Sequence, residues 1–422
     1  MLRVAIATLG CKTNAYESSA IVAQFQESDV SVVPFDAEAD VYIVNTCTVT
    51  GRTDFKSRNL IRKALARKAV DPAVRIVVTG CFAQREPDEI RALGEIDLIV
   101  DNQNKLDIAS LLQQKQYEFA DIMAARDFAY RPLRQMVDHS RAFQKIQDGC
   151  DFRCAYCAVP YGRGNSRSAS FEDVLGQARL FVGSGYKEIV LGGVNLGLYN
   201  HGGKTLADVV LALREIQGLE LLRLSSLEPM LFTPDLLDAL AEVPQLCPHF
   251  HIALQSGCDA VLERMGRHYG TEAFSTLISD LLARFPDAAI GLDVIAGFPG
   301  ETEAEFSQTL AFLEGLGIAY LHAFSFSRRK GTPAYDLPGQ IPKNEINQRT
   351  KVLTDLSARK KELYKQKLIR ERIALRGVCE SVSHGLGTFL SDHYIRGYAQ
   401  DSPAAGQICR IVPQTIYRDG LR

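Results

Sequence analysis

Residues 1–110 alternate short apolar runs with stretches of helical spacing. Three of the runs are rich in β-branched residues, and each ends on a turn that carries a cysteine. They read VAIATLGC to Cys11, VYIVNTC to Cys47 and RIVVTGC to Cys81. Alternating strands and helices predict a parallel sheet, and ligands collect at the carboxyl ends of its strands. We therefore expect these cysteines to converge at one edge, whereas separate burial at three strand ends is the alternative.

Six further apolar runs follow between residues 141 and 340. They read RAFQKIQ, KEIVLGGV, LLRLSSLE, HFHIALQS, AIGLDVIAGF and YLHAFSFS. Helical windows separate them, at 171–183, 206–216, 234–241, 274–283 and 303–313. Repeated strand–helix units predict a parallel barrel, but ordinary closure takes eight units. The central region is therefore expected to form a partial barrel that is open on one side and can admit a large substrate.

The remaining segments lack this alternation. Periodicity is lost over 111–140, which indicates a connecting segment. Residues 341–370 form a basic stretch of helical spacing, and 371–422 consist of short apolar runs separated by glycine turns. We expect an α/β protein with a parallel sheet domain over 1–110 and a partial β/α barrel over 141–340, followed by a basic helical connection and a small all-β domain.

Composition narrows the class of protein. The 422 residues carry a formal net charge of −2, so any RNA contact must use local basic patches rather than an overall positive field. No apolar window of about eighteen residues occurs, and the amino terminus does not resemble a signal peptide. We therefore expect a cytoplasmic protein without membrane contact. Ten cysteines in such a protein favour metal or redox chemistry over disulfides.

Two basic stretches are candidates for such patches. The first follows Cys47 and repeats cations at helical spacing, at Arg58, Arg62, Lys63, Arg67 and Lys68. The second is 343–376, which holds eleven Lys or Arg against four acids. For each stretch, a solvated helix face and a phosphate-binding face are both open interpretations.

Three cysteines after the first barrel strand have the spacing Cys-x3-Cys-x2-Cys, at Cys150, Cys154 and Cys157. Three thiolates are one fewer than a 4Fe–4S cube needs, so one iron keeps an open position for a substrate or cofactor. A zinc knuckle is the alternative, but it needs a fourth ligand, and the nearest upstream histidine, His139, is eleven residues away. The spacing favours the cluster. The other cysteines belong to no motif and are expected to be buried: Cys247, Cys258, Cys379 and Cys409.

Glycines and polar residues stand at or near the carboxyl ends of the later barrel strands. They are Gly192 and Gly193 in LGGVN, Ser226 and Glu228 in RLSSLEP, Gln255 in LQSG, and Asp293 in DVIAGFPGET. Each of them alone is typical of a turn or a strand end. Because barrel active sites are built from these ends, the set predicts a cofactor pocket that faces the cysteine triplet.

These motifs resemble those of the methylthiotransferase family within the radical S-adenosylmethionine (SAM) superfamily, and in particular its branch acting on tRNA N6-threonylcarbamoyladenosine. The resemblance covers nearly the whole chain. It rests on TLGCKTNAYES, VNTCTVTGRTDFKSRN, VVTGCFAQ, KIQDGCDFRCAYCAVPYGRG, RLSSLEP, DVIAGFPGET and FSFSRRKGTPA. The chain departs from the family in one motif, because SRRKGTPA replaces the usual PRPGT after the sixth strand.

The resemblance implies two 4Fe–4S clusters and SAM as cofactors. Catalytic Cys150, Cys154 and Cys157 would hold the SAM-cleaving cluster, and Cys11, Cys47 and Cys81 would hold an auxiliary one. The implied SAM pocket comprises Tyr156, Gly192, Gly193, Ser226, Glu228, Gln255 and Asp293. One SAM molecule would donate the methyl group, and a second would give the 5′-deoxyadenosyl radical that removes the adenine C2 hydrogen.

The implied substrate is the N6-threonylcarbamoyladenosine immediately 3′ of the anticodon, in the tRNA anticodon stem-loop. A low-potential electron donor of the flavodoxin or ferredoxin type and a sulfur donor are further implied partners. The carboxy-terminal domain resembles a TRAM module, which is an RNA-binding barrel, but it is short and has few basic residues. We therefore expect much of the phosphate binding on 359–376.

Other functions stay open at this point. The same chemistry could act on isopentenyladenosine in tRNA or on an aspartate of a ribosomal protein. A non-catalytic iron–sulfur protein that binds RNA would also account for the cysteines and the terminal β domain. Only an enzyme would form 5′-deoxyadenosine from SAM and a reductant.

Overall fold

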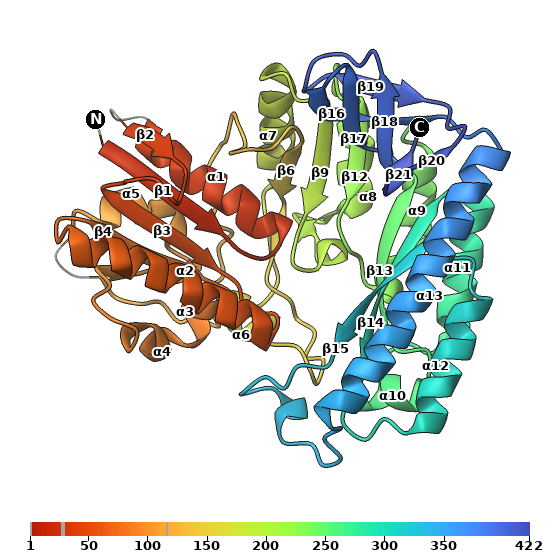
Figure 1. Cartoon of the computed structure of the whole chain (residues 1–422), viewed down its shortest axis with the longest axis horizontal. Coiled ribbons are helices and arrows are strands. Elements are labelled where there is room, and N and C mark those ends of the chain that lie inside the picture. The colour runs from red at the N-terminus through yellow and green to blue at the C-terminus, as the bar shows by residue number, and fades with distance from the viewer. Residues whose placement is uncertain (1, 27–29, 115–116) are drawn as a thin grey trace.

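The N-terminal domain of the computed structural model is built on one parallel sheet (Figure 1). The structure describes residues 2–26, 30–114 and 117–422. The sheet order is β2-β1-β3-β4-β5, and all neighbours are parallel. Its strands are β1 (Leu2–Thr8), β2 (Val30–Val33), β3 (Val41–Thr46), β4 (Arg75–Gly80) and β5 (Leu98–Ile99). β1, β3 and β4 confirm the three predicted runs, whereas the short edge strands β2 and β5 were not predicted.

Helices cover both faces of this sheet because its central strands are apolar on both sides. Ile43 and Val77 pack with α1 and α5 on one face, whereas Val44 and Val78 pack with α2 and α3 on the other. The helices are α1 (Lys12–Gln26), α2 (Gly51–Val70), α3 (Cys81–Arg85), α4 (Pro87–Arg91), the 3-10 helix η1 (Lys105–Asp107) and α5 (Ile108–Leu111). The alternation of side chains along each strand therefore builds two cores.

Six parallel strands form the partial barrel. They are β6 (Ala142–Lys145), β9 (Glu188–Gly192), β12 (Leu221–Leu224), β13 (His249–Gln255), β14 (Ala289–Ala296) and β15 (Tyr320–Ser325). They pair as two three-stranded sheets, β12-β9-β6 and β13-β14-β15. Isolated parallel bridges from Leu222 to Leu246 and from Leu227 to Ile252 join the two halves. The six predicted strands and the open barrel are thus confirmed.

The barrel helices begin where the sequence supplies capping side chains. Ser170 and Thr233 each accept a hydrogen bond from a first-turn backbone N–H, and Thr302 forms a capping box with Glu305. The helices are α6 (Val159–Arg163), α7 (Phe171–Gly183), α8 (Leu206–Arg214), α9 (Pro234–Ala241), α10 (Asp259–Arg264), α11 (Thr271–Arg284) and α12 (Glu303–Gly315). Each predicted window falls on one of them, and the short α6 and α10 were not predicted.

One long helix, α13 (Lys343–Arg370), runs along β14 and β15 and joins the barrel to the last domain (Figure 1). Several of its cations bond within the protein. Lys360 Nζ donates to the carbonyl oxygens of Glu314 and Leu316, at 2.8 and 2.7 Å, and Lys367 Nζ donates to that of Pro286 at 2.6 Å. The basic run therefore fastens the helix to the barrel, a role that the sequence did not reveal.

The last domain is all-β, as predicted. Its six-stranded sheet has the order β19-β16-β17-β18-β21-β20. The strands are β16 (Leu375–Ser383), β17 (Leu386–Leu390), β18 (Arg396–Gln400), β19 (Ile408–Ile411), β20 (Ile416–Tyr417) and β21 (Gly420–Leu421). The domain contacts the barrel near the amino-terminal ends of its strands, where the Tyr394 ring stacks on His249 with centroids 4.2 Å apart. It lies opposite the strand ends that bear the motif residues.

Short elements complete the chain. They are β7 (Gln147–Asp148), β8 (Arg167–Ser168), β10 (Asn200–His201), β11 (Lys204–Thr205) and the 3-10 helices η2 (Leu196–Leu198), η3 (Pro229–Leu231) and η4 (Pro333–Tyr335). Between α5 and β6, the described residues form turns and loops. None of the helices in the described ranges is long and apolar enough to cross a membrane. The four cysteines outside the motifs are all buried, as expected.

Candidate active site between two cysteine triads

The first triad lies where neighbouring strands of the N-terminal sheet end. Thr8 pairs with Asn45 and Thr46 with Gly80, so the turns that carry Cys11, Cys47 and Cys81 leave the same edge. Gly10 adopts a φ of +101°, and a Cβ there would lie 2.8 Å from Cys47 Sγ. The glycine thus allows the Cys11 turn to approach Cys47 closely.

The thiols of this first triad influence one another. Burial raises the pKa of Cys47 to about 12, and the nearby thiols of Cys81 and Cys11 contribute to the rise. Cys47 is buried, Cys81 is half-buried and Cys11 is exposed. The three cysteines therefore converge, as the sequence predicted. The triad is open to solvent on the side of Cys11.

The second triad lies on the loop between β7 and α6. The Cys150 N–H donates to the carbonyl oxygen of Gly164 at 3.0 Å, and the Cys157 N–H donates to that of Cys154 at 3.0 Å. Burial raises the pKa of Cys157 to about 12 and also raises that of Cys150. A ligand that binds thiolates must therefore displace tightly held protons.

Two side chains that the sequence did not single out donate to these sulfur atoms. Arg267 Nη1 lies 3.1 Å from Cys154 Sγ, and Asn195 Nδ2 lies 3.7 Å from Cys150 Sγ. Asn195 Oδ1 is buried without a hydrogen-bond partner in the described structure. Donors directed at sulfur stabilise the thiolate form and tune an iron–sulfur cluster, so the second triad suits such a group.

The thiols of the two triads are not arranged as a site for a single metal ion. Within the described part of the chain, no three His, Cys, Asp or Glu side chains are arranged to hold one metal ion. An iron–sulfur cube instead distributes its thiolates over separate iron atoms.

Several predicted pocket residues meet at a cavity beside the second triad. Tyr156, Cys157, Gln255 and Asp293 line this cavity of about 170 Å³. Gln255, which ends β13, has a φ of +72°, a strained backbone conformation for a residue other than glycine. Strain of this kind is typical of functional sites, where surrounding contacts hold a side chain in place.

Ser226 and Asp293 are linked by a residue that sequence reasoning missed. His251 Nδ1 lies 2.9 Å from Ser226 Oγ, and His251 Nε2 lies 2.8 Å from Asp293 Oδ1. The alternation in HFHIALQS places His251 on a barrel strand, but only the fold shows which neighbours it joins. These two contacts of His251 fix the orientation of the Asp293 carboxylate at the cavity wall.

Glu228 does not line this cavity and pairs with a cation instead. Its carboxylate pairs with Arg267, with Nη1 and Oε1 3.2 Å apart. Arg267 is the residue that also contacts Cys154, and its Nη1 lies 3.5 Å from the Tyr156 hydroxyl. Glu228 is therefore linked to Cys154 through Arg267. Arg267 lies in no sequence motif, so the sequence gave no signal for it.

The two predicted glycines lie behind the second triad rather than at the cavity. A Cβ on Gly193 would lie 2.8 Å from Gln147 Oε1, which accepts the Asn195 N–H at 2.8 Å. Gly192 uses its carbonyl oxygen to accept the Ile146 N–H at 2.9 Å. Gly193 therefore lets the end of β9 pack against Gln147, which precedes the loop that carries Cys150.

A larger cavity of about 990 Å³ reaches the first triad. It is lined by Cys11 and Cys47, by the start of α2, by the end of β15 and by the first two turns of α13. The two cavities share six lining residues: Val49, Thr50, Phe324, Ser325, Phe326 and Ser327. We call the combined space the inter-triad cleft, because it runs from Cys157 to Cys11 and Cys47.

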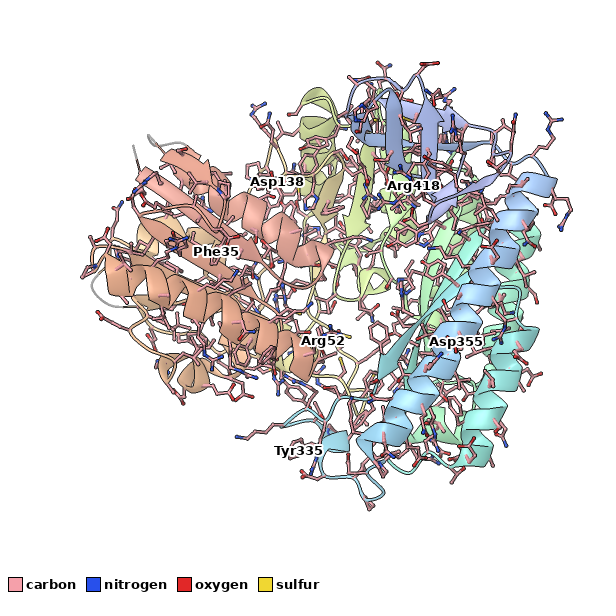
Figure 2. All side chains as sticks on the ribbon, in the orientation of Figure 1. Phe35, Arg52, Asp138, Tyr335, Asp355 and Arg418 are labelled. Carbon is pink, nitrogen blue, oxygen red and sulfur yellow. The ribbon has the colours of Figure 1, made fainter. Side chains whose placement is uncertain are left out.

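The walls of the inter-triad cleft combine exposed apolar side chains with cations. Val49 and Phe324 are 53% and 39% exposed. Arg52 and Lys343 also line the cleft, and neither has an ion-pair partner among the described residues. Figure 2 shows Arg52 at the end of α2 that faces the barrel. Such walls suit a ligand with a flat ring and negative charge.

Polar contacts fix the N-terminal domain against the barrel at the rim of the cleft. Arg329 Nη2 lies 2.6 Å from an Asp54 carboxylate oxygen and donates to Thr48 Oγ1 at 2.6 Å. The Gly51 N–H donates to Ser327 Oγ at 3.1 Å. Arg329 lies in SRRKGTPA at the position where the usual PRPGT also has its arginine, so a residue of the shared pattern supplies this interdomain contact.

Two family patterns match the chain. The uncharacterized protein family UPF0004 matches residues 3–101, and the radical SAM superfamily matches residues 145–313. The first match covers the sheet that bears one triad, and the second covers most of the barrel that bears the other.

Named relatives match most of the chain. It is 38% identical to the Bacillus subtilis threonylcarbamoyladenosine tRNA methylthiotransferase MtaB, over 85% of this chain and 80% of that protein. It is 32% identical to the Cereibacter sphaeroides tRNA-2-methylthio-N(6)-dimethylallyladenosine synthase, over 83% and 81%. Among solved structures, the radical SAM methyltransferase TsrM from Kitasatospora setae shares the fold, with a TM-score of 0.60, 14% identity, and 79% and 77% coverage.

Proposed function

Because the chain belongs to the methylthiotransferase family of radical SAM enzymes, we propose that it adds a methylthio group at C2 of N6-threonylcarbamoyladenosine in tRNA. The target nucleoside is the one immediately 3′ of the anticodon. The family type is that of the MtaB relatives, which match the chain over most of its length.

The two triads are the proposed cofactor sites. Cys150, Cys154 and Cys157 would hold the 4Fe–4S cluster that binds SAM, whereas Cys11, Cys47 and Cys81 would hold the auxiliary one. Tyr156, Gln255 and Asp293, which line the smaller cavity, would form the wall against which SAM binds. When bound, these groups supply a 5′-deoxyadenosyl radical, which attacks an aromatic C–H that acid–base chemistry cannot activate.

The inter-triad cleft carries the proposal. If one triad held the group that supplies the sulfur and the other held the group that supplies the radical, both sites would have to open into one space to act on the same nucleoside. The cleft touches Cys157 at one end and Cys11 and Cys47 at the other. Its larger part, about 990 Å³, is at the upper end of the usual ligand-site volumes.

The cations of the cleft favour a substrate with a carboxylate. The threonylcarbamoyl group ends in a carboxylate, whereas a dimethylallyl group is apolar. Arg52 and Lys343 provide positive charge at the cleft wall, and Phe324 provides an exposed ring on which a base can stack. We therefore propose that Phe324 stacks on the nucleobase and that Arg52 pairs with the carboxylate of its N6 substituent.

Other partners follow from the reaction. Reductive cleavage of SAM requires a low-potential electron donor, for which a flavodoxin or ferredoxin is suitable, and the inserted sulfur requires a donor.

We also propose that 1–110, 141–340 and 371–422 act as the sheet, barrel and TRAM-like domains, joined by the segments 111–140 and 341–370.

Nucleoside analysis of tRNA tests the proposal. Cells that lack this protein should accumulate N6-threonylcarbamoyladenosine, and the wild-type gene should restore its 2-methylthio derivative. The triple variant of Cys150, Cys154 and Cys157 to alanine should not restore it, whereas Cys258→Ala, which removes a buried cysteine outside both triads, should. An unchanged level of the 2-methylthio nucleoside in the deletion strain would sink the assignment.

The dimethylallyladenosine reaction is the second candidate, because a relative with that name is 32% identical to the chain. The same nucleoside analysis separates the two functions. Loss of 2-methylthio-dimethylallyladenosine in the deletion strain, with the threonylcarbamoyl product intact, would support this second function instead.

A further inference from the structure

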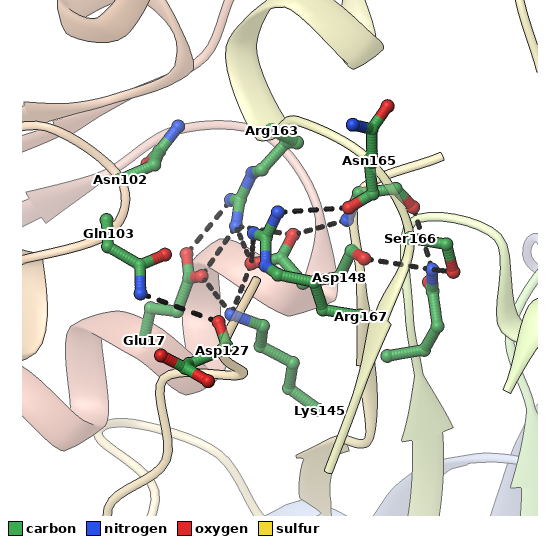
Figure 3. Close-up of polar contacts among 12 residues, drawn as sticks. Glu17, Asn102, Gln103, Asp127, Lys145, Asp148, Arg163, Asn165, Ser166 and Arg167 are labelled. Carbon is green, nitrogen blue, oxygen red and sulfur yellow. Dashed lines mark hydrogen bonds and ion pairs between the residues drawn. The ribbon is translucent and has the colours of Figure 1, made fainter. Parts of the chain in front are cut away.

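A buried ionic network lies between the N-terminal sheet and the loop that follows the second triad (Figure 3). Glu17 of α1, which is fully buried, accepts hydrogen bonds from three cations of distant segments. Lys145 Nζ lies 2.8 Å and Arg163 Nη1 2.5 Å from Glu17 Oε1, and Lys105 pairs with Glu17 Oε2. The network thus crosses from the first domain to the barrel.

Arg163 uses its entire guanidinium group in this network. Nη1 contacts Glu17 and also Asp148, at 3.3 Å, while Nη2 donates to Glu17 Oε2 at 2.9 Å and to Asn14 Oδ1. The remaining donor, Nε, points to Cys81 Sγ at 3.1 Å. All five N–H groups of the fork therefore have acceptors, so the group has one defined orientation.

Through these bonds, Arg163 reaches every turn of the first triad. It contacts Cys81 directly. Asn14, which accepts from Arg163, donates through Nδ2 to the carbonyl oxygens of Leu9 and Thr46, at 2.6 and 3.1 Å. These two residues immediately precede the turns of Cys11 and Cys47, so one side chain from the barrel supports all three turns.

Arg163 also lies close to the second triad in the amino-acid sequence. It ends α6, which begins two residues after Cys157. The next residue, Gly164, accepts the Cys150 N–H at 3.0 Å. Asn102 adds a parallel link, because its Nδ2 donates to the Gly162 carbonyl oxygen at 2.5 Å and lies 3.8 Å from Cys81 Sγ.

The network carries more positive than negative charge. It holds four buried cations, Lys105, Lys145, Arg163 and Arg167, against two buried acids, Glu17 and Asp148, which leaves two positive charges in excess. Buried charge without a counterion is costly. The Cys81 sulfur, in contact with Arg163, is a site where an anionic group can offset this excess.

We propose that Arg163 is a positioning residue that couples the two triads: it holds the three turns of the first triad in register with the Cys150–Cys157 loop and offsets negative charge at Cys81. This proposal rests on the proposed function, in which Cys11, Cys47 and Cys81 hold a cluster. Positive charge beside a cluster stabilises its reduced, more negative form. Arg163 therefore raises the reduction potential of the auxiliary cluster.

The test uses full-length protein that carries alanine at Cys150, Cys154 and Cys157, so that only the auxiliary cluster is loaded anaerobically. Arg163→Gln and Arg163→Lys are compared in this background by iron content and by reduction potential from an EPR-monitored titration. Arg349→Gln is the matched control, because Arg349 is buried and ion-paired to Glu301 outside both triads. It removes a buried charge without touching any motif cysteine.

We expect Arg163→Gln to lower the reduction potential of the auxiliary cluster and to change its EPR signal. Arg163→Lys keeps the charge but loses the planar guanidinium group, so its reduction potential should lie between those of Arg163→Gln and the parent. If Arg163→Gln does not fold or loads no cluster while the control loads fully, the lysine variant's potential decides. The proposal would be overturned if either cluster-loaded Arg163 variant had the same reduction potential and EPR signal as the Arg349→Gln control. Failure of the parent itself to bind iron would instead refute the cluster assignment of the proposed function.

Discussion

At the scale of single residues, Cys154 and Cys81 share one feature: each sulfur lies 3.1 Å from a nitrogen of a buried arginine. A buried positive charge in this position can offset negative charge on a group that binds at the sulfur. Carboxylates anchor both arginines, since Arg267 pairs with Glu228 and Arg163 with Glu17. The charge is thus held in place independently of the cofactor.

Arg52 is expected to contribute to substrate choice. Replacing Arg52 with alanine should weaken binding of an anticodon stem-loop that carries the threonylcarbamoyl group by about tenfold, the loss of one charge-assisted hydrogen bond. Binding of the same stem-loop without the modification should change less, since it offers no carboxylate there. Fluorescence anisotropy measures both. The control is Lys56→Ala on the same helix, outside the lining of the cleft; an equal loss for both RNAs in Arg52→Ala would contradict the expectation.

The buried thiols make stability depend on pH. Burial raises the pKa of Cys157 from its ordinary value of 9.0 to about 12. Between these pH values, the unfolded chain loses the proton while the folded chain keeps it, so stability falls as pH rises from about 9 towards 12. Urea unfolding of the cluster-free protein from pH 7 to 11 measures the slope. Cys157→Ser, which does not titrate there, should give a shallower fall; identical slopes would count against a buried, protonated thiol.

At the scale of elements, α13 serves two purposes along its length. Its middle and end are bound to the barrel by lysines that donate to backbone carbonyl oxygens, including Lys360 and Lys367. Its first turn instead lines the inter-triad cleft through Lys343. The expectation of phosphate contacts on 359–376 stays a prediction, although Lys360 and Lys367 of this segment already have hydrogen-bond partners within the protein.

Two lysines of α13 should therefore behave differently. Lys343→Ala should weaken tRNA binding a few-fold and reduce its salt dependence by about one unit of slope, because one cation leaves the RNA interface. Lys360→Ala should leave RNA binding near the parent value but lower the free energy of unfolding by about 1 kcal/mol, since two carbonyl oxygens lose their donor. Filter binding at several salt concentrations and urea unfolding test the pair. Weaker RNA binding in Lys360→Ala together with unchanged RNA binding in Lys343→Ala would contradict these two roles.

At the scale of the whole molecule, the carboxy-terminal domain closes the amino-terminal end of the partial barrel. Arg223 of β12 pairs with Glu188 and donates to the carbonyl oxygen of Ser391 at 2.9 Å. A core of barrel, α13 and domain residues continues the contact, including Tyr320, Leu368 and Ile395. The domain therefore stabilises the barrel from the end opposite to the inter-triad cleft.

Removing one aromatic contact should measure that stabilisation. Tyr394→Ala should lower the free energy of unfolding by about 2 kcal/mol, because its ring stacks on His249 and Tyr320. Tyr394→Phe keeps the ring and should be close to the parent. SAM binding, measured by equilibrium dialysis on the cluster-loaded protein, should be unchanged in both. A large loss of SAM binding in Tyr394→Phe would show that the two ends of the barrel are linked more directly.

Much of the fold was predictable from local patterns. The β-branched runs that end at Cys11, Cys47 and Cys81 became β1, β3 and β4, and the six barrel strands appeared in order. The misses were short elements, such as β2 and α10, whose few residues leave no clear period. The limits drawn between the five segments stay predictions.

The sequence by itself determined the two cysteine triads, the strand–helix order and the family, because these depend on spacing and on periods of a few residues. Only the tertiary structure decided that Arg163 reaches Cys81, that Arg267 reaches Cys154 and that His251 links Ser226 to Asp293. Arg163 and Cys81 are 82 positions apart. Such contacts arise when a sheet and a barrel pack against each other, and that packing depends on the summed burial of two surfaces, which no single stretch of sequence encodes.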